Sequence, residues 1–306
     1  MPGGVINTGS HPKLLWPGIR DLWGQVYDEH SEEYTDLYEI NTSNRAYEQD
    51  VEITAFGLAP VKNQGSAGSY DSEMQGWVTT YMHVAYALGY IVTFEEIEDD
   101  QYKEVASRRA KANAFSMRQT IENVGAFLYN NAFSSTYFTT PDGQPLISTS
   151  HVSANGLTFS NRLTTNADLS EASLEDMCVQ IMNATQGRGL KISVMPRSLH
   201  LAPSELYNAQ RILKSVLQND TANNAINALR ALNSIPEGIK VNHYFTDPDA
   251  WFLRTNIPNG MQMFWRNKPM FDKDNDFDTK NAKALAYMRF STGCTDPRGI
   301  YGTPGA

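Results

Sequence analysis

Residues 77–94 read "WVTTYMHVAYALGYIVTF", and this stretch decides the fold. Its large side chains alternate along the chain with a period of two, which is typical of a β-strand. Eighteen residues at about 3.3 Å each span roughly 60 Å, whereas a compact chain of this length has a radius of gyration of only about 19 Å. We therefore expect the strand either to bend at Gly89 or to project beyond its own domain.

A second strand precedes this one and makes it one side of a ribbon. Val51, Ile53 and Ala55 alternate with Glu52 and Thr54, and the glycine-rich stretch "KNQGSAGSYD" (62–71) separates the two strands. A lone two-stranded ribbon is only marginally stable in water. A projecting ribbon therefore needs a neighbour to lie on, and this is the first indication of assembly.

The glycine-rich tip matches no template for a reactive or phosphate-binding loop. A P-loop is excluded because Gly68 is followed by Ser69 and Tyr70, and only Gly65 and Gly68 are available for a dinucleotide fingerprint. A nucleophile elbow is excluded because Ser66 lacks a glycine two positions before it. The sequence predicts a flexible turn that carries no chemistry.

Residues 98–130 predict one long helix. Acidic side chains crowd its start, where the helix dipole favours them, and an apolar stripe with helical spacing follows at Ala114, Met117, Ile121, Val124 and Leu128. At about 1.5 Å per residue the helix would be about 50 Å long. We interpret it as a structural strut.

The rest of the chain alternates between the two periodicities and has no repeat of 20–50 residues. Ser173 is the expected N-cap of a helix that ends at "QGRG" (186–189), and Pro203 is expected to open another helix. We expect helices at 19–27, 174–182, 203–217 and 225–232, and strands at 190–196, 239–246, 250–255, 261–267 and 282–291. The fold class is therefore α+β, a mixed α/β architecture.

The N-terminal segment is acidic and aromatic. Residues 1–18 are predicted to form a loop, and residues 1–104 hold 18 acidic and 5 basic residues, whereas the remainder has a net charge of +4. Such a segment does not suit phosphate binding; it suits a strap on a mildly basic neighbour, or its charge serves solubility alone. Because the segment is too polar to form its own core, its aromatic residues predict an arm that docks elsewhere; they include Trp16, Trp23, Tyr34 and Tyr38.

Other sites are absent or incomplete. Because no apolar run is about 18 residues long and the first residues lack a charged-then-apolar pattern, we expect neither a transmembrane span nor a signal peptide, and Cys178 and Cys294 match no metal or redox spacing. An acidic run is spaced like a calcium loop, but Phe277 and Lys283 stand where an EF-hand needs glycine and glutamate. This run is Asp272, Asp274, Asp276 and Asp278, and an exposed acidic loop is the favoured alternative. We predict no catalytic residue, no cofactor and no enzyme activity.

The C-terminal third carries a resemblance to a known family. "DPDAWFLRTN" (247–256), "RNKPMF" (266–271) and "AYMRFSTGCTDPRGIYGTPGA" (286–306) resemble the ending of many major capsid proteins of tailed bacteriophages, which have the Hong Kong 97-like fold. "PLISTSHVSANGLTFSNRLT" (145–164) with "DLSEASLEDM" (168–177) is similar to the Mu-like major head subunit group. "LKISVMPRSLHLAPSELYNAQRILKS" (190–215) resembles the strand and helix of the domain that meets the capsomer centre.

The resemblance implies a division of the chain. Residues 1–47 would be an N-terminal arm, 48–94 the extended hairpin loop, 95–150 the spine helix with the first part of the peripheral domain, 151–250 the axial domain, and 251–306 the strands that return to these domains. Contacts between subunits are expected from the arm aromatics and from the loop tip, where the candidates are Lys62, Gly65, Gly68 and Tyr70. Lys62 beside Asn63 could serve an isopeptide crosslink, but no partner residue can be placed.

The resemblance also implies a function. The chain would self-assemble as hexamers and pentamers into an icosahedral shell in the host cytoplasm and remain in the virion capsid. Its partners would be other copies, a separate scaffolding protein, a portal, double-stranded DNA bound on the inner face without sequence specificity and, in some relatives, a decoration protein; no membrane is involved. A nanocompartment shell of the same fold and an unrecognised α/β enzyme are the alternatives.

Overall fold

The computed structural model describes residues 12–54, 56–73, 75–98, 102–218, 225–276, 278–279 and 281–306. The helices are α1 (Pro12–Glu29), α2 (Tyr34–Leu37), α3 (Phe94–Glu98), α4 (Tyr102–Asn130), α5 (Glu171–Met182), α6 (Leu206–Lys214) and α7 (Ala228–Ala231). The strands are β1 (Glu39–Thr42), β2 (Tyr47–Ile53), β3 (Gln75–Met82), β4 (Val84–Val92), β5 (His151–Val152), β6 (Thr158–Phe159), β7 (Pro196–Leu201), β8 (Ile239–Val241), β9 (Trp251–Thr255), β10 (Met261–Asn275), β11 (Ala282–Cys294) and β12 (Ile300–Thr303).

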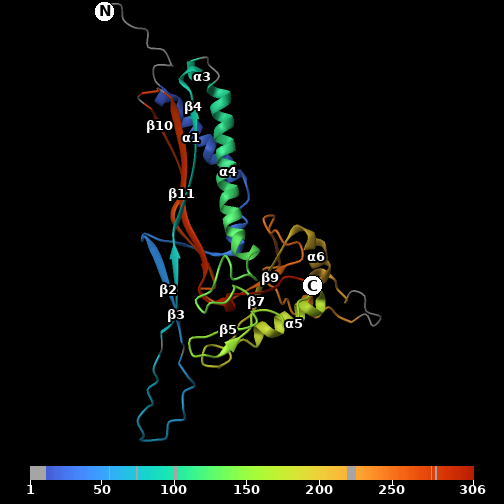
Figure 1. Ribbon diagram of the computed structural model, residues 1–306. Coiled ribbons are helices and arrows are strands. Elements are labelled where there is room, and N and C mark those ends of the chain that lie inside the picture. The colour runs from blue at the N-terminus through green and yellow to red at the C-terminus, as the bar shows by residue number, and fades with distance from the viewer. Residues whose placement is uncertain are drawn as a thin grey trace, which may run out of the picture.

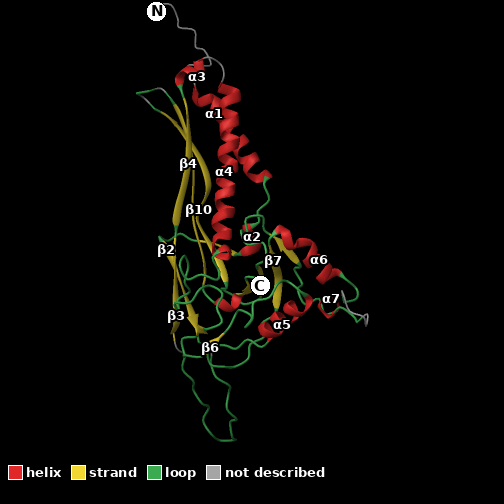
Figure 2. Ribbon diagram, turned by 45° about the vertical axis from the view of Figure 1, so that its right-hand side comes forward, coloured by secondary structure: helices red, strands yellow, loops and turns green. Residues whose placement is uncertain are grey.

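Two four-stranded sheets and a ribbon give the molecule its shape. One sheet has the order β1-β10-β11-β4 and runs beside α4, and the other has the order β12-β9-β7-β8 and lies in the wider body with α5 and α6 (Figure 1). β2 and β3 form a separate antiparallel ribbon. Figure 2 shows that the ribbon continues the line of β4 and ends in a long loop beyond the body.

The long helix packs on the first sheet through its apolar stripe. Ala110, Ala114, Met117 and Ile121 of α4 are buried in one core with the inward side chains of β10 and β11. The small side chains on α4 let the helix approach the sheet closely. The predicted helix is thus confirmed from Tyr102 onward, while Glu98 belongs to the separate α3. The residues between α3 and α4 lie outside the described part.

The strand does not bend at Gly89, and only the loop at the end of the ribbon extends beyond the body (Figure 2). Near His83 the chain changes partners, because β3 pairs with β2 whereas β4 pairs with β11. Gly89 lies within β4, where an added Cβ would be 2.7 Å from the carbonyl oxygen of Ala284, so glycine serves close strand approach there. Of the upstream strand, β2 ends at Ile53, and Ala55 lies outside the described residues.

The N-terminal aromatics correct one interpretation of the sequence. Trp23, Tyr34 and Tyr38 are 5%, 6% and 2% exposed, and all three belong to the core around α4. The indole of Trp23 stacks on Phe271 with ring centroids 5.4 Å apart and donates to Asn113 Oδ1 at 2.9 Å. The inference that these aromatics lack a core within their own chain is wrong, because α1 and α2 pack directly on α4.

Two further N-terminal predictions have different outcomes. The loop expected over 1–18 is wrong from Pro12 onward, where α1 begins, and residues 1–11 lie outside the described part. The side chain of Trp16 also falls outside it. Trp23, Tyr34 and Tyr38 therefore leave our set of candidate contacts between subunits, and Trp16 remains an untested prediction.

A buried carboxylate joins α4 to α2. The two oxygens of Glu122 accept the backbone N–H groups of Glu33 at 3.1 Å and Tyr34 at 2.9 Å, and the residue is only 1% exposed. Burial is the largest influence and raises the pKa of Glu122 to about 7, although these hydrogen bonds act in the opposite direction.

We expect the contribution of Glu122 to the stability of the subunit to fall as the pH rises from about 4.3 to about 7. An unfolded glutamate releases its proton near pH 4.3, so between that pH and about 7 the native state binds more protons, and its stability falls with rising pH. The effect is at most about 4 kcal/mol. Thermal denaturation of unassembled Glu122→Gln between about pH 4.5 and 8 should show a flatter fall than the wild type; equal slopes would contradict this assignment.

The second core supports the body and refines several boundaries. Ser170, not Ser173, is the N-cap of α5, because Ser173 reciprocates from the third helical position in a capping box. The strand expected at 190–196 is wrong: apart from an isolated bridge at Lys191 this stretch is irregular, and β7 begins at Pro196, since proline is suited to the first residue of a strand. The helix expected at 203–217 is α6, which spans only Leu206–Lys214, and the helix expected at 225–232 is α7, which spans only Ala228–Ala231. The strand expected at 239–246 is β8, which ends at Val241. The other strands, β9, β10 and β11, are confirmed.

Candidate interaction surfaces

The ribbon is fastened to the body along much of its length. Tyr81 Oη on β3 lies 2.6 Å from Thr295 Oγ1. The hydroxyl of Thr295 in turn donates to Asp50 Oδ2 on β2 at 3.0 Å. Further along β3, Trp77 Nε1 donates to the carbonyl oxygen of Val152 at 2.9 Å. Much of the expected projecting ribbon therefore lies against its own chain.

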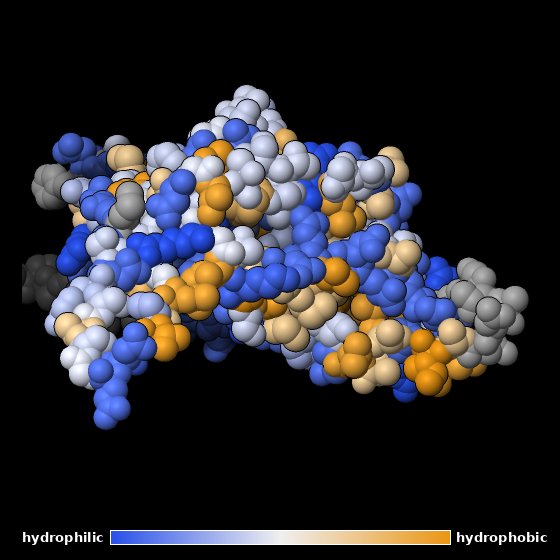
Figure 3. Space-filling model, turned by 90° about the horizontal axis from the view of Figure 1, so that it is seen from below, coloured by the Kyte–Doolittle hydropathy of each residue, from blue (hydrophilic) through white to orange (hydrophobic). Residues whose placement is uncertain are grey.

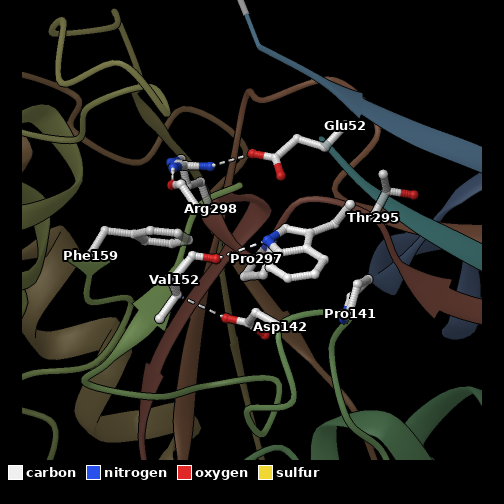
Figure 4. Close-up of a pocket in the computed structure, with 10 residues that line it drawn as sticks. Glu52, Pro141, Asp142, Val152, Phe159, Thr295, Pro297 and Arg298 are labelled. Carbon is white, nitrogen blue, oxygen red and sulfur yellow. Dashed lines mark hydrogen bonds and ion pairs between the residues drawn. The ribbon is translucent and has the colours of Figure 1, made fainter. Parts of the chain in front are cut away.

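Arg298 is the centre of this junction (Figure 4). It is 3% exposed, its guanidinium lies 3.9 Å from the ring centroid of Phe159, and it donates to Ser153 Oγ at 2.8 Å. The same side chain lies 3.1 Å from Asp296 and 3.5 Å from Glu52 of β2. One buried cation thus ties the ribbon to β6 and to the segment before β12.

The two carboxylates compete for that cation. Burial raises the pKa of Glu52, with a further contribution from the negative charge of Asp296, while Arg298 lowers it. The pair is favourable because the guanidinium is otherwise fully surrounded by protein and needs opposite charges nearby. This site was not predicted from the sequence, because Glu52, Ser153 and Arg298 are far apart in the chain.

The last fastening lies at Asp71 and Ser72, where Arg188 reaches across from the loop after α5. Residues 58–70, beyond this point, are exposed throughout, and Val61 and Tyr70 are 93% and 100% exposed. The free tip is therefore a short segment that carries large apolar side chains with no cover from the described residues.

The four predicted tip candidates, Lys62, Gly65, Gly68 and Tyr70, all lie on this free tip. Gly65 has a φ of +82°, which glycine adopts readily, and Ser66 N–H donates to the carbonyl oxygen of Asn63 at 3.1 Å. The Ser66 hydroxyl donates to the same oxygen at 2.7 Å. The tip is thus built as a turn, in agreement with the prediction from its sequence.

A second exposed apolar surface lies at the far end of the body. Figure 3 shows hydrophobic side chains gathered at the end of the body that carries α6 in Figure 1. This α6–α7 patch consists of Tyr207, Val216, Leu217, Ile226 and Leu232, all of them exposed. Exposed apolar side chains that lie close together are typical of an interaction site.

The acidic run does not gather into a cage. Asp272 and Asp274 lie on β10, Asp276 follows the strand and pairs with Lys283 at 2.6 Å, and Asp278 lies in the next turn. The hydrogen bond from Lys283 is the main cause that lowers the pKa of Asp276. Among the described residues, no group of three or more His, Cys, Asp or Glu side chains is placed to hold a metal ion.

Two of the cavities lie beside residues discussed above. A cleft of about 690 Å³ lies between α1, α2 and β10, and rings such as Trp23 and Trp265 line it without any serine, cysteine or histidine. The space beside Arg298 holds only about 10 Å³. A search of the described helices for one long and apolar enough to cross a membrane finds none.

Comparison with solved structures identifies the architecture. The capsid of the cyanophage P-SCSP1u matches with a TM-score of 0.55 at 9% identity, covering 90% of this chain and 88% of that one. A structure from Mycobacterium phage Patience matches with a TM-score of 0.54 at 13% identity, covering 97% and 88%. A virus-like particle from Pyrococcus furiosus matches with a TM-score of 0.51 at 10% identity, covering 94% and 98%.

Sequence comparison gives the family. No curated protein matches the chain. The model of the family described as phage capsid protein matches residues 77–303, which include most of β3, then β4, α4, the strands from β5 to β12 and Arg298. The mixed helix and sheet architecture is the Hong Kong 97-like fold expected from the sequence, and the chain belongs to the phage capsid protein family.

Proposed function

We propose that this chain is a major capsid protein, which self-assembles as hexamers and pentamers into an icosahedral shell around double-stranded DNA. The single observation that carries the proposal is the family match over residues 77–303. The role is structural, and the surfaces described above serve contacts between copies and not catalysis.

The placement of the exposed surfaces supports association between copies. The free tip at 58–70 and the α6–α7 patch lie on different parts of the molecule (Figure 1). Each surface can therefore contact a different surface on a neighbouring copy. Contacts between unlike surfaces are heterologous, and they generate rings when the rotation between subunits closes. Rings of six and five copies are the capsomers that we propose.

Several finer assignments are part of the proposal. The free tip lies on the adjacent subunit, residues 151–250 form mainly the axial domain, and the motifs at 145–177 are similar to those of the Mu-like major head group. A separate scaffolding protein and a portal take part in assembly, which occurs in the host cytoplasm, and the finished shell is the virion capsid. A decoration protein is an optional addition.

A nanocompartment shell is the second candidate, because a virus-like particle from Pyrococcus furiosus has a similar fold. The family match favours the phage capsid. The contents of purified particles distinguish the two: packaged DNA supports the capsid, whereas an enclosed protein cargo supports the nanocompartment.

We expect removal of the free tip to damage shells and spare the subunit. Replacing residues 59–69 with an Asn-Gly turn deletes exposed side chains and keeps Asp71 and its contacts. The melting temperature of the unassembled subunit should change little, while shells seen by negative-stain microscopy should become fewer or misshapen.

The matched control is the double variant Ser66→Ala and Ser69→Ala, which keeps the length of the tip and should assemble normally. Equal thermal losses in subunits and shells would show that the tip packs on its own domain. Intact shells from the shortened chain would contradict the role that we give to the tip.

A further inference from the structure

The outermost fastening of the ribbon is a charged pair. Arg188 Nη1 lies 2.5 Å from Asp71 Oδ2, and its Nη2 donates to the carbonyl oxygen of Ser72 at 2.5 Å. The same carboxylate oxygen accepts the N–H of Gly57, on the other side of the ribbon, at 2.8 Å. One carboxylate and one guanidinium therefore join both sides of the ribbon to the body.

The body presents Arg188 from a tight turn. Gly189 has a φ of +81° and donates its N–H to the carbonyl oxygen of Gln186 at 2.8 Å, and Gln186 N–H donates to Leu190 at 2.8 Å. The Gln186 side chain also donates to the carbonyl oxygen of Phe56 at 3.4 Å. Because the turn is closed by its own hydrogen bonds, the guanidinium starts from a fixed backbone.

The ribbon side of the contact is equally close. A Cβ on Gly57 would lie 3.3 Å from Asp71 Oδ2 and 3.4 Å from Arg188 Nη1. Glycine at this position therefore lets the two sides of the ribbon meet at the charged pair. The N–H of Gly57 is the first of several groups that lower the pKa of Asp71, and Arg188 also contributes, so the carboxylate is ionised at neutral pH.

We propose that Asp71 and Arg188 form a clasp that fixes where the free tip begins and in which direction it leaves the body. The inference rests on the proposed assembly function and adds two positioning residues to it. The clasp fixes the direction of the tip before the subunit binds another copy. Association then has fewer tip conformations to exclude, and its entropic cost is smaller.

The exposure of the pair makes the clasp adjustable. The side chains of Asp71 and Arg188 are 44% and 23% exposed, and solvent and salt weaken ion pairs of this kind. The clasp therefore biases the direction of the tip without locking it. Contacts with an adjacent subunit can still shift the tip when the shell forms.

The test measures release of the tip in the unassembled full-length chain. Lys62 is the only lysine or arginine between Arg45 and Lys103, so the rate of trypsin cleavage after it reports how freely the tip opens. We expect Arg188→Ala to raise that rate about two- to fivefold, as loss of an exposed ion pair allows. Arg188→Lys should be intermediate, because an ammonium group can pair with Asp71 but lacks the fork that also reaches Ser72.

Arg197→Ala is the matched control, since Arg197 forms a similarly exposed ion pair with Glu237 on the body and should leave cleavage after Lys62 unchanged. About 0.5 M NaCl should bring the wild type toward the Arg188→Ala rate, because the salt screens the pair. Equal rates for wild type and Arg188→Ala overturn the clasp.

The assembly reaction completes the test. Arg188→Ala should give shells that are fewer or less uniform in diameter than those of Arg197→Ala. Faster cleavage with unchanged shells overturns the positioning role. Faster cleavage in a chain that never assembles, even as wild type with scaffold, supports the clasp and contradicts the proposed capsid function.

Discussion

Removing residues 1–45 is expected to leave a chain that does not fold. The deletion takes away α1, α2, β1 and, among the side chains that the structure describes, six of the buried core, including Trp23, Tyr34 and Leu37. Removing a single buried aromatic side chain costs about 3–5 kcal/mol, and a whole domain is stable by only about 5–15 kcal/mol. Expression of the truncated chain should therefore give aggregated or degraded protein with no cooperative thermal transition.

A point variant separates loss of packing from the other effects of truncation. Trp23→Ala removes the stacking on Tyr27, with ring centroids 5.1 Å apart, and leaves Asn113 without its indole partner. We expect a loss of about 3–5 kcal/mol in the free energy of unfolding, measured by urea denaturation of the subunit. Tyr70→Ala, at a fully exposed position, is the control and should change little. A truncated chain that melts like the wild type would restore the idea of a detachable arm.

The sequence was informative wherever a periodic pattern was long. The apolar stripe on α4 and the alternation through β3 and β4 predicted the long helix and the ribbon. A helix or strand that buries one face has apolar residues at a fixed spacing, and that spacing can be read from the sequence. The turn at Gly65 was also predictable, since its chemistry is local.

Contacts between distant segments were not predictable in the same way. The acidic composition near Trp23 and Tyr34 suggested a segment without a core, yet α4 supplies that core from about 90 positions further along the chain. A single sequence carries no record of such pairings. The same holds for Arg298, whose partners lie 145 and 246 positions away at Ser153 and Glu52.

Replacement of Arg298 is expected to be the most damaging single change at the base of the ribbon. Arg298→Met keeps much of the apolar contact with Phe159 but leaves Glu52 and Asp296 without their cation. Removing one partner from a buried ion pair costs about 3–5 kcal/mol. We expect a value near the lower end, because both carboxylates keep some contact with water.

The pH dependence of this variant distinguishes lost charge pairing from lost packing. Without Arg298, the pKa of Glu52 should rise further above its ordinary range, since the main influence that lowers it is gone. A carboxyl whose native pKa is raised stabilises the native state at low pH and loses that contribution as the pH rises. The difference in melting temperature between wild type and Arg298→Met should therefore shrink toward about pH 5.

The double variant Glu52→Gln with Arg298→Met tests this explanation. It removes the unpaired charge of Glu52 and should recover part of the stability lost in Arg298→Met. Because Glu52 lies on β2 and Arg298 precedes β12, this recovery would show that the ion pair itself fastens the ribbon to the body. A pH-independent deficit, unchanged by Glu52→Gln, would mean that Arg298 acts through its contacts with Phe159 and Ser153 alone.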